Sequence, residues 1–201
     1  MAAAGKVCTG FSLPYVATYA ASGGSVTYAS GQKLARGVNV TISPEVADDN
    51  VFYADNVAAE TIGGTFSGGE VELTVDGLLV AAERLIMGLP AASSLSVGSG
   101  TVSVYEYGDN QSIPYVGIAF IARYMSDGVT SYTPILLTKA RFNTFETSAA
   151  TQEDAIDWQT QSLTATLMRD DTSNHYWKKL AEDQTTEAAA EAVIKAWFSI
   201  A

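Results

Sequence analysis

The chain is poor in the residue types that build catalytic and metal sites. Its 201 residues include one cysteine, Cys8, and one histidine, His175. A single cysteine excludes an internal disulfide bond, and one histidine with one cysteine cannot supply the ligands of a zinc site. No phosphate-binding loop and no Gly-x-Ser-x-Gly nucleophile motif is present. These absences favour a binding or assembly role over an enzyme, and we expect no cofactor and no metal.

Positive charge is also scarce. Lys and Arg number 11 against 22 Asp and Glu, so the formal net charge is −11. Wrapping nucleic acid requires Lys and Arg to neutralise phosphates, so this composition excludes such a role. It remains compatible with a wall that DNA slides past without sticking. Charged residues make up only 16% of the chain, and a weakly polar surface of this kind is often covered by further copies of the same protein.

Long apolar runs are missing as well. No stretch reaches the length of a membrane span, and residues 1–8 lack the apolar region of a secretory signal peptide. We therefore expect a protein that is made and folded in a cytoplasm, with no membrane partner. The length is sufficient for a single large all-β domain, and we expect residues 1–201 to form one.

Alternation of apolar and polar residues is the commonest pattern that is present. Within residues 70–76, Val71, Leu73 and Val75 form one face, and the opposite face is polar and acidic. Residues 113–124 are nearly all apolar, which predicts a strand buried on both faces. Residues 22–25 and 126–128 have turn chemistry, and the second turn predicts a hairpin. The predicted strands are residues 11–21, 26–29, 33–43, 70–76, 101–107, 113–124, 130–147 and 156–168.

The hydrophobic period becomes helical in two places. A mid-chain helix of about three turns is predicted, with Asp76 as N-cap and Gly88 as the stop. A second helix is predicted from Thr186 to Phe198, within a C-terminal helical segment at 174–201. Its apolar stripe, which we expect to pack on the protein's own sheet, consists of Ala189, Val193 and Trp197. The predicted fold class is mainly β, a β-sandwich or barrel-like fold with these two helices.

Residues 45–62 form an acidic segment without a clear period, and we expect a long loop there. No Lys or Arg occurs between Arg36 and Arg84. Aromatic side chains supply much of the energy of interfaces and charges supply register, so the segment is a candidate contact surface. The alternative is a solvated loop with two aromatic residues in the core. The segment fails the pattern of an EF-hand calcium loop. The candidate contact residues are Glu45, Asp48, Asp49, Phe52, Tyr53, Asp55, Asn56 and Glu60.

The same segment carries a family resemblance. Ser43-Pro44-Glu45, a few polar and acidic residues, and then Phe-Tyr-Ala-Asp-Asn-Val-Ala-x-Glu-Thr at 52–61 resemble the signature of phi13-type phage major tail proteins. Similar features follow in the same order: a glycine-rich bend, the strand at 70–76, a short helix, the run Lys-Ala-Arg-Phe-Asn at 139–143 and the run beginning Trp-Gln-Thr-Gln-Ser-Leu at 158. The likeness extends from about residue 10 to about residue 170, and residues 91–100 have no counterpart in it.

The resemblance implies a structural role in the tail tube of long, non-contractile phage tails. It implies a β-sandwich tail tube fold whose copies close into hexameric rings, which stack into a tube around a tape measure protein. Tail initiator and terminator proteins would be further partners, and DNA would pass through the lumen without specific binding. The protein would be assembled in the host cytoplasm and end in the virion. Residues 45–62 would reach a neighbouring subunit or ring, and Glu70 and Glu72 would form part of an acidic lumen wall.

Two other functions stay open on the sequence alone. Ten Tyr and three Trp could stack on sugars, as in a carbohydrate-binding β-sandwich module. A glycoside hydrolase would need paired carboxylates, which are plentiful here, but no spacing in the sequence supports such a pair. Filament formation would favour the tube, and reversible glycan binding would favour the module.

Overall fold

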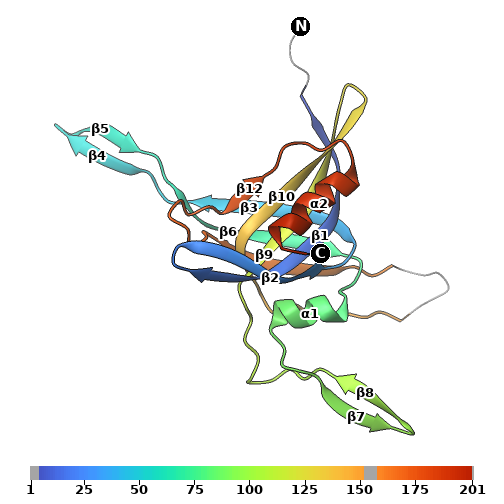
Figure 1. Ribbon diagram of the computed structural model, residues 1–201. Helices are drawn as coiled ribbons and strands as arrows, with labels where there is room; N and C mark the ends of the chain where they lie inside the picture. The colour runs from blue at the N-terminus through green and yellow to red at the C-terminus, as the bar shows by residue number, and fades with distance from the viewer. Residues whose placement is uncertain (1–4, 152–157, 201) are drawn as a thin grey trace.

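The computed structural model describes residues 5–151 and 158–200. It is mainly β, with one short helix in mid-chain and one near the C-terminus, as predicted (Figure 1). The strands are β1 (Val7–Ser22), β2 (Ser25–Lys33), β3 (Gly37–Val46), β4 (Asn50–Ala54), β5 (Val57–Ile62), β6 (Phe66–Val75), β7 (Ser93–Val97), β8 (Gly100–Val104), β9 (Val116–Ser126), β10 (Val129–Phe142), β11 (Gln161–Met168) and β12 (Lys178–Leu180), and the helices are α1 (Val80–Met87) and α2 (Glu187–Trp197).

An eight-stranded antiparallel sheet forms the body of the protein, in the order β2-β1-β9-β10-β11-β6-β3 with β12 attached to β10. The long strand β10 pairs with β12 through Ile135–Leu137 and with β11 through Lys139–Phe142. Residues from both halves of the sheet pack in one hydrophobic cluster, so the arrangement is sandwich-like. The two predicted turns are confirmed, with left-handed backbone at Gly23-Gly24 and at Asp127-Gly128.

Residues 116–122 of β9 are buried on both faces, which confirms that part of the strand predicted at 113–124; residues 113–115 precede the strand, and Arg123 is exposed. Ile118 and Phe120 lie in the cluster between the two halves of the sheet. Ala119 and Ile121 point the other way and pack beneath α2. Because successive side chains of a strand point to opposite faces, one apolar run contributes to two separate hydrophobic clusters.

The mid-chain helix is shorter than predicted and starts later. Helix α1 begins after Leu79, which makes no side-chain cap. The carboxylate of Asp76, the predicted N-cap, instead accepts hydrogen bonds from the backbone and the guanidinium of Arg36. The predicted stop at Gly88 is confirmed, since its backbone is left-handed and a side chain there would clash with Ser112.

Helix α2 covers the outer side of β9 and β10 (Figure 1). The predicted cap is confirmed, because the Thr186 hydroxyl accepts a hydrogen bond from the Ala189 amide at 3.2 Å. The predicted stripe of Ala189, Val193 and Trp197 was wrong by one position, because these residues are only half-buried. The fully buried residues are Ala190, Ile194 and Phe198.

Several other boundaries differ from the predictions. Helix occupies only 187–197 of the segment 174–201, because residues 178–180 form β12 and pair with β10. Residues 93–104 form a hairpin where a loop and a separate strand were predicted. The first residues of the predicted strand 156–168 lie outside the described residues, and β11 starts at Gln161.

Candidate assembly surface

The acidic segment is a projecting β-hairpin and not the predicted loop. Strands β4 and β5 pair from Asn50↔Ile62 to Ala54↔Val57, and they extend away from the body (Figure 1). Asp55 and Asn56 make the turn, both with left-handed backbone. Asp and Asn tolerate this conformation, and two such residues match a hairpin whose turn twists with its strands. We call residues Asn50–Ile62 the acidic arm.

The base of the acidic arm is fixed to the body. The Asp49 carboxylate accepts a hydrogen bond from the Gly64 amide at 2.9 Å. A side chain at Gly64 would collide with the Ala47 carbonyl, so this crossing needs glycine. Next to it, Phe66 stacks on Trp177 with ring centroids 4.7 Å apart. These contacts fix the point at which the arm leaves the body.

The predicted contact residues are distributed along this arm and its approach. Phe52 and Tyr53 are 63% and 66% exposed, so the alternative of two core aromatics is wrong. Residues Asp55, Asn56 and Glu60 are exposed as well. Glu45 lies on the end of β3, and Asp48 lies between β3 and β4, both exposed. Asp49 is exposed too and caps the base of the arm.

A second projecting hairpin was missed by the sequence analysis. Strands β7 and β8 pair from Ser93↔Val104 to Val97↔Gly100 and extend away from α1 (Figure 1). A two-residue turn at Gly98-Ser99, between stretches rich in Ser, Thr and Val, was the available signal. Leu95, Val97 and Val102 are more than half exposed. We call residues Ser93–Val104 the neutral arm, because none of them is charged.

Helix α1 holds the segment that follows the neutral arm. The Tyr107 hydroxyl donates to the Glu83 carboxylate at 2.5 Å, and the Arg84 guanidinium lies 4.8 Å from the centre of the Tyr105 ring. Burial, together with the Glu83 carboxylate, raises the pKa of Tyr107 to about 12. Glu83 and Arg84 are half-buried by these contacts.

The outer face of the sheet carries the residues predicted for a lumen wall. Glu70 and Glu72 are exposed on β6, and the alternate residues Val71 and Leu73 are buried. Each glutamate lies opposite a threonine of β11. The same face becomes basic on β10, where Arg141 lies in the same cross-strand row as Glu70. Glu70 and Glu72 are therefore exposed on the outer face of the sheet.

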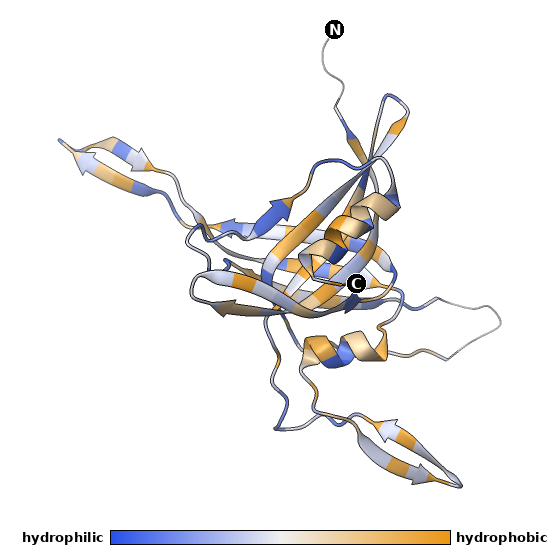
Figure 2. Cartoon of the chain, in the orientation of Figure 1, coloured by the Kyte–Doolittle hydropathy of each residue, from blue (hydrophilic) through white to orange (hydrophobic). Residues whose placement is uncertain are grey.

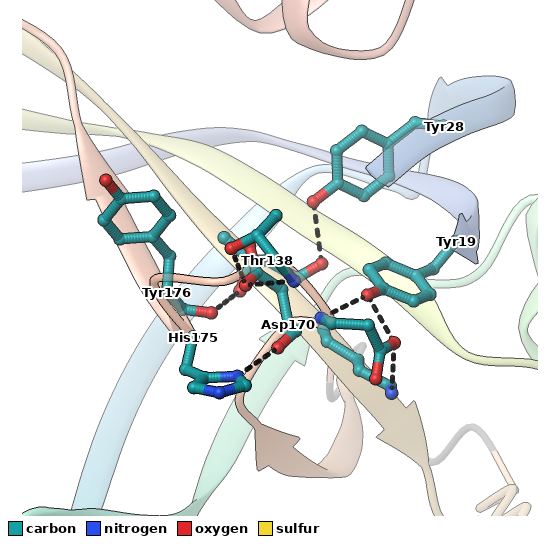
Figure 3. A network of polar contacts seen from close by, with 9 residues as sticks. Tyr19, Tyr28, Thr138, Asp170, His175 and Tyr176 are labelled. Carbon is teal, nitrogen blue, oxygen red and sulfur yellow. Dashed lines mark hydrogen bonds and ion pairs between the residues drawn. The ribbon is translucent and has the colours of Figure 1, made fainter. Parts of the chain in front are cut away.

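A polar network holds the connection between β11 and β12 (Figure 3). The Lys139 ammonium lies 2.8 Å from the Asp171 carboxylate and holds the pKa of that carboxyl below its usual value. The hydroxyl of Tyr19 donates to the same carboxylate at 2.6 Å. On the other side of the connection, the Thr138 hydroxyl donates to the Tyr176 carbonyl at 2.6 Å. The connection is therefore tied to β1 and β10 at both ends.

The remaining chemistry-bearing residues form no catalytic arrangement in the described part of the chain. The His175 ring lies 3.3 Å from the Asp170 carbonyl, and this contact does not involve a nucleophile. Cys8 is exposed on β1. Within residues 5–151 and 158–200, no three His, Cys, Asp or Glu side chains gather as metal ligands. Neither of the two described helices is long and apolar enough to span a membrane.

No protein-family model matches the chain, and no curated protein matches it.

Proposed function

We propose that this protein is a structural subunit that self-assembles into stacked hexameric rings forming a tube, as phi13-type phage major tail proteins do. The observation that carries this proposal is the pair of projecting arms. Both arms carry exposed apolar residues, and Figure 2 shows hydrophobic positions along both hairpins where they extend away from the body. Isolated two-stranded hairpins are at best marginally stable in water, so such arms are typical of segments that a second chain covers.

The ends of the sheet also support assembly. Strands β2 and β3 are the last strands in the sheet order, and each pairs with one neighbour within the chain. A strand with an open edge is a template for pairing with another chain, and closure into a ring removes that edge. Stacking of rings is a heterologous contact, which continues into a filament.

The outer face with Glu70 and Glu72 is our candidate for the lumen wall. Carboxylates and threonine hydroxyls on this face would repel DNA at short range and offer few phosphate contacts. On this proposal the protein is not an enzyme. Its partners are further copies of itself, a tape measure protein, and tail initiator and terminator proteins, and its destination is the virion.

Negative-stain electron microscopy of the purified, concentrated protein tests the proposal. We expect hollow tubes or stacked rings above a threshold concentration, because ring and stacking contacts both depend on mass action. Monomers at every concentration, with or without a tail initiator complex, would overturn it.

A carbohydrate-binding module is the second candidate, and one exposed aromatic favours it. Trp158 is 83% exposed and precedes residues that line an open pocket of about 500 Å³. Asp76, Glu146 and Gln161 are among the polar residues of this pocket, and a flat aromatic beside polar groups suits a sugar ring. A glycan-binding screen separates the candidates: the module requires reversible binding that Trp158→Ala abolishes, and the tube requires none.

A further inference from the structure

Seven of the eleven Lys and Arg side chains, all of which lie in the described residues, are in no ion pair with a carboxylate of that part of the chain. Three of the seven lie near β12, and the other four, Lys33, Arg84, Arg123 and Arg141, are scattered. Among the described residues, Lys6, Arg36, Lys139 and Lys195 are ion-paired with carboxylates. Arg169, Lys178 and Lys179 are in no such pair and lie within one short stretch of the chain. Of the nearby carboxylates, Asp171 and Asp183 are already bound to Lys139 and Lys6, and Glu182 is exposed beyond the end of β12. The Lys178 and Lys179 ammonium groups are therefore available to an external carboxylate, whereas the Arg169 guanidinium donates to the Thr65 hydroxyl and the Phe66 carbonyl.

These cations belong to a surface with aromatic and apolar groups. Arg169 and Trp177 both contact Phe66, at the base of the acidic arm. The Lys178 ammonium lies 5.8 Å from the Trp177 ring centre, and the Lys179 ammonium lies 5.4 Å from that of Tyr176. Tyr176 and Leu180 are 45% and 61% exposed. We call Arg169, Tyr176, Lys178, Lys179 and Leu180 the basic patch.

The basic patch is preorganised to receive a partner. Among the described residues β12 pairs only with β10, which leaves its other edge for a further strand. The preceding residues are held by the network of Figure 3, where the Trp177 carbonyl accepts from the Thr138 amide at 3.1 Å. A strand that is fixed before binding loses less conformational entropy when a partner arrives.

We propose that the acidic arm of one copy docks on the basic patch of a second copy. The inference rests on the proposed function and names the partner surface of its most exposed segment. Within the acidic arm, Asp55 and Glu60 are the only charged residues. They would face Lys178 and Lys179, and the exposed side chains of Phe52 and Val57 would cover Tyr176 and Leu180.

Electrostatics decides between this patch and the rest of the surface. Two copies with a net charge of −11 each repel one another, so a carboxylate-bearing arm gains attraction only where cations are in excess. The patch and the arm are different surfaces of the same chain. Their contact is therefore heterologous, and each bound copy presents a new arm and a new patch.

Charge reversal in both partners tests the proposal. The patch variant is Lys178→Glu with Lys179→Glu, and the arm variant is Asp55→Asn with Glu60→Lys, which keeps a turn-compatible residue at position 55. We expect each variant alone to lose association, and an equimolar mixture of the two to recover it. Arg123→Glu with Arg141→Glu is the control for the same change in net charge, and it retains association. Equal association of the patch variant and the wild type would overturn the proposal.

Disulfide cross-linking gives a second readout that does not require tubes. In a Cys8→Ser background, Val57→Cys protein is mixed with Leu180→Cys protein under mild oxidation, and a concentration-dependent heterodimer is expected. Val129→Cys, at the exposed start of β10, replaces Leu180→Cys as the control and cross-links at least tenfold less. Tubes without the Val57–Leu180 cross-link would retain the proposed function and overturn this contact. The cross-link without tubes would retain this contact and overturn the proposed function.

Discussion

The two arms are built alike and differ in charge. Each is a hairpin with a two-residue turn, and each exposes apolar side chains over most of its length. The acidic arm carries Asp55 and Glu60 and no Lys or Arg, and the neutral arm carries no charged residue. In a chain of net charge −11, a neutral arm can meet another copy almost anywhere that is apolar. An acidic arm is restricted to a basic surface, so its charge selects its partner site.

Removing the arms should have the largest effect. It should impair assembly without lowering the stability of the fold. We expect replacement of residues 50–62 by a short Gly-Asn turn to abolish assembly, because it removes the selective contact. The melting temperature should change little, since the arm contributes nothing to either buried cluster of the body. Sedimentation velocity and thermal circular dichroism measure the two outcomes.

The matched control for the arm removal is the same replacement of residues 93–104. It should weaken assembly less steeply than loss of the acidic arm, because neutral apolar contacts carry less selectivity. An acidic-arm deletion that assembles as well as the wild type would remove the distinction between the arms.

Salt should change assembly through the charges of the acidic arm, with an effect of intermediate size. At about 1 M salt the screening length falls to about 3 Å, which weakens both arm–patch attraction and the general repulsion between copies. A variant with Asp55→Asn and Glu60→Gln retains only the repulsion, so salt should favour its assembly. The wild type also loses the arm–patch attraction. On going to high salt, the critical concentration for assembly should therefore rise in the wild type relative to that variant by about tenfold, or about 1.4 kcal/mol. Pelleting measures the critical concentration at each salt concentration. An equal salt dependence in the two proteins would show that the arm charges do not contribute to assembly.

Local turn chemistry was sufficient to find some hairpins and was overlooked for others. Asp127-Gly128 was recognised from the sequence, whereas Asp55-Asn56 and Gly98-Ser99 carry the same kind of signal and were assigned to loops. The acidic composition around Asp55 obscured the pattern, because charged residues are typical of solvated loops. The exposed aromatics of that segment were nevertheless recognised as contact candidates from composition alone.

Features that depend on distant partners could not be predicted. Asp76 has the position of a helix cap, but Arg36, 40 residues away, takes its carboxylate. The buried stripe of α2 includes Ile194 because that side of the helix packs on Ala119 and Ile121 of β9. The basic patch likewise depends on the pairing of β12 with β10, which fixes residues 178–180 beside residues 135–137. Tertiary pairing overrides local preference in each case.

The smallest effect we expect concerns the hydrogen bond next to the neutral arm. The pKa of Tyr107 is raised from 10.0 to about 12 by burial and by the Glu83 carboxylate. Because the folded pKa exceeds the unfolded one, this interaction stabilises the protein fully below pH 10 and is lost as the pH rises through about 12. Tyr107→Phe should therefore remove one late-ionising phenol from a spectrophotometric titration.

The same variant should distinguish the two arms in hydrogen exchange. Amides of Ser93–Val104 should exchange a few-fold faster in Tyr107→Phe, because the segment that anchors this hairpin to α1 is then less firmly held. Amides of Asn50–Ile62 should be unaffected, since their anchor is the separate contact between Asp49 and Gly64. Tyr105→Phe keeps its ring beside Arg84 and serves as the control, with exchange at the wild-type rate in both arms. Acceleration in both arms would mean that they share one anchoring unit, and the difference between them would then lie in charge alone.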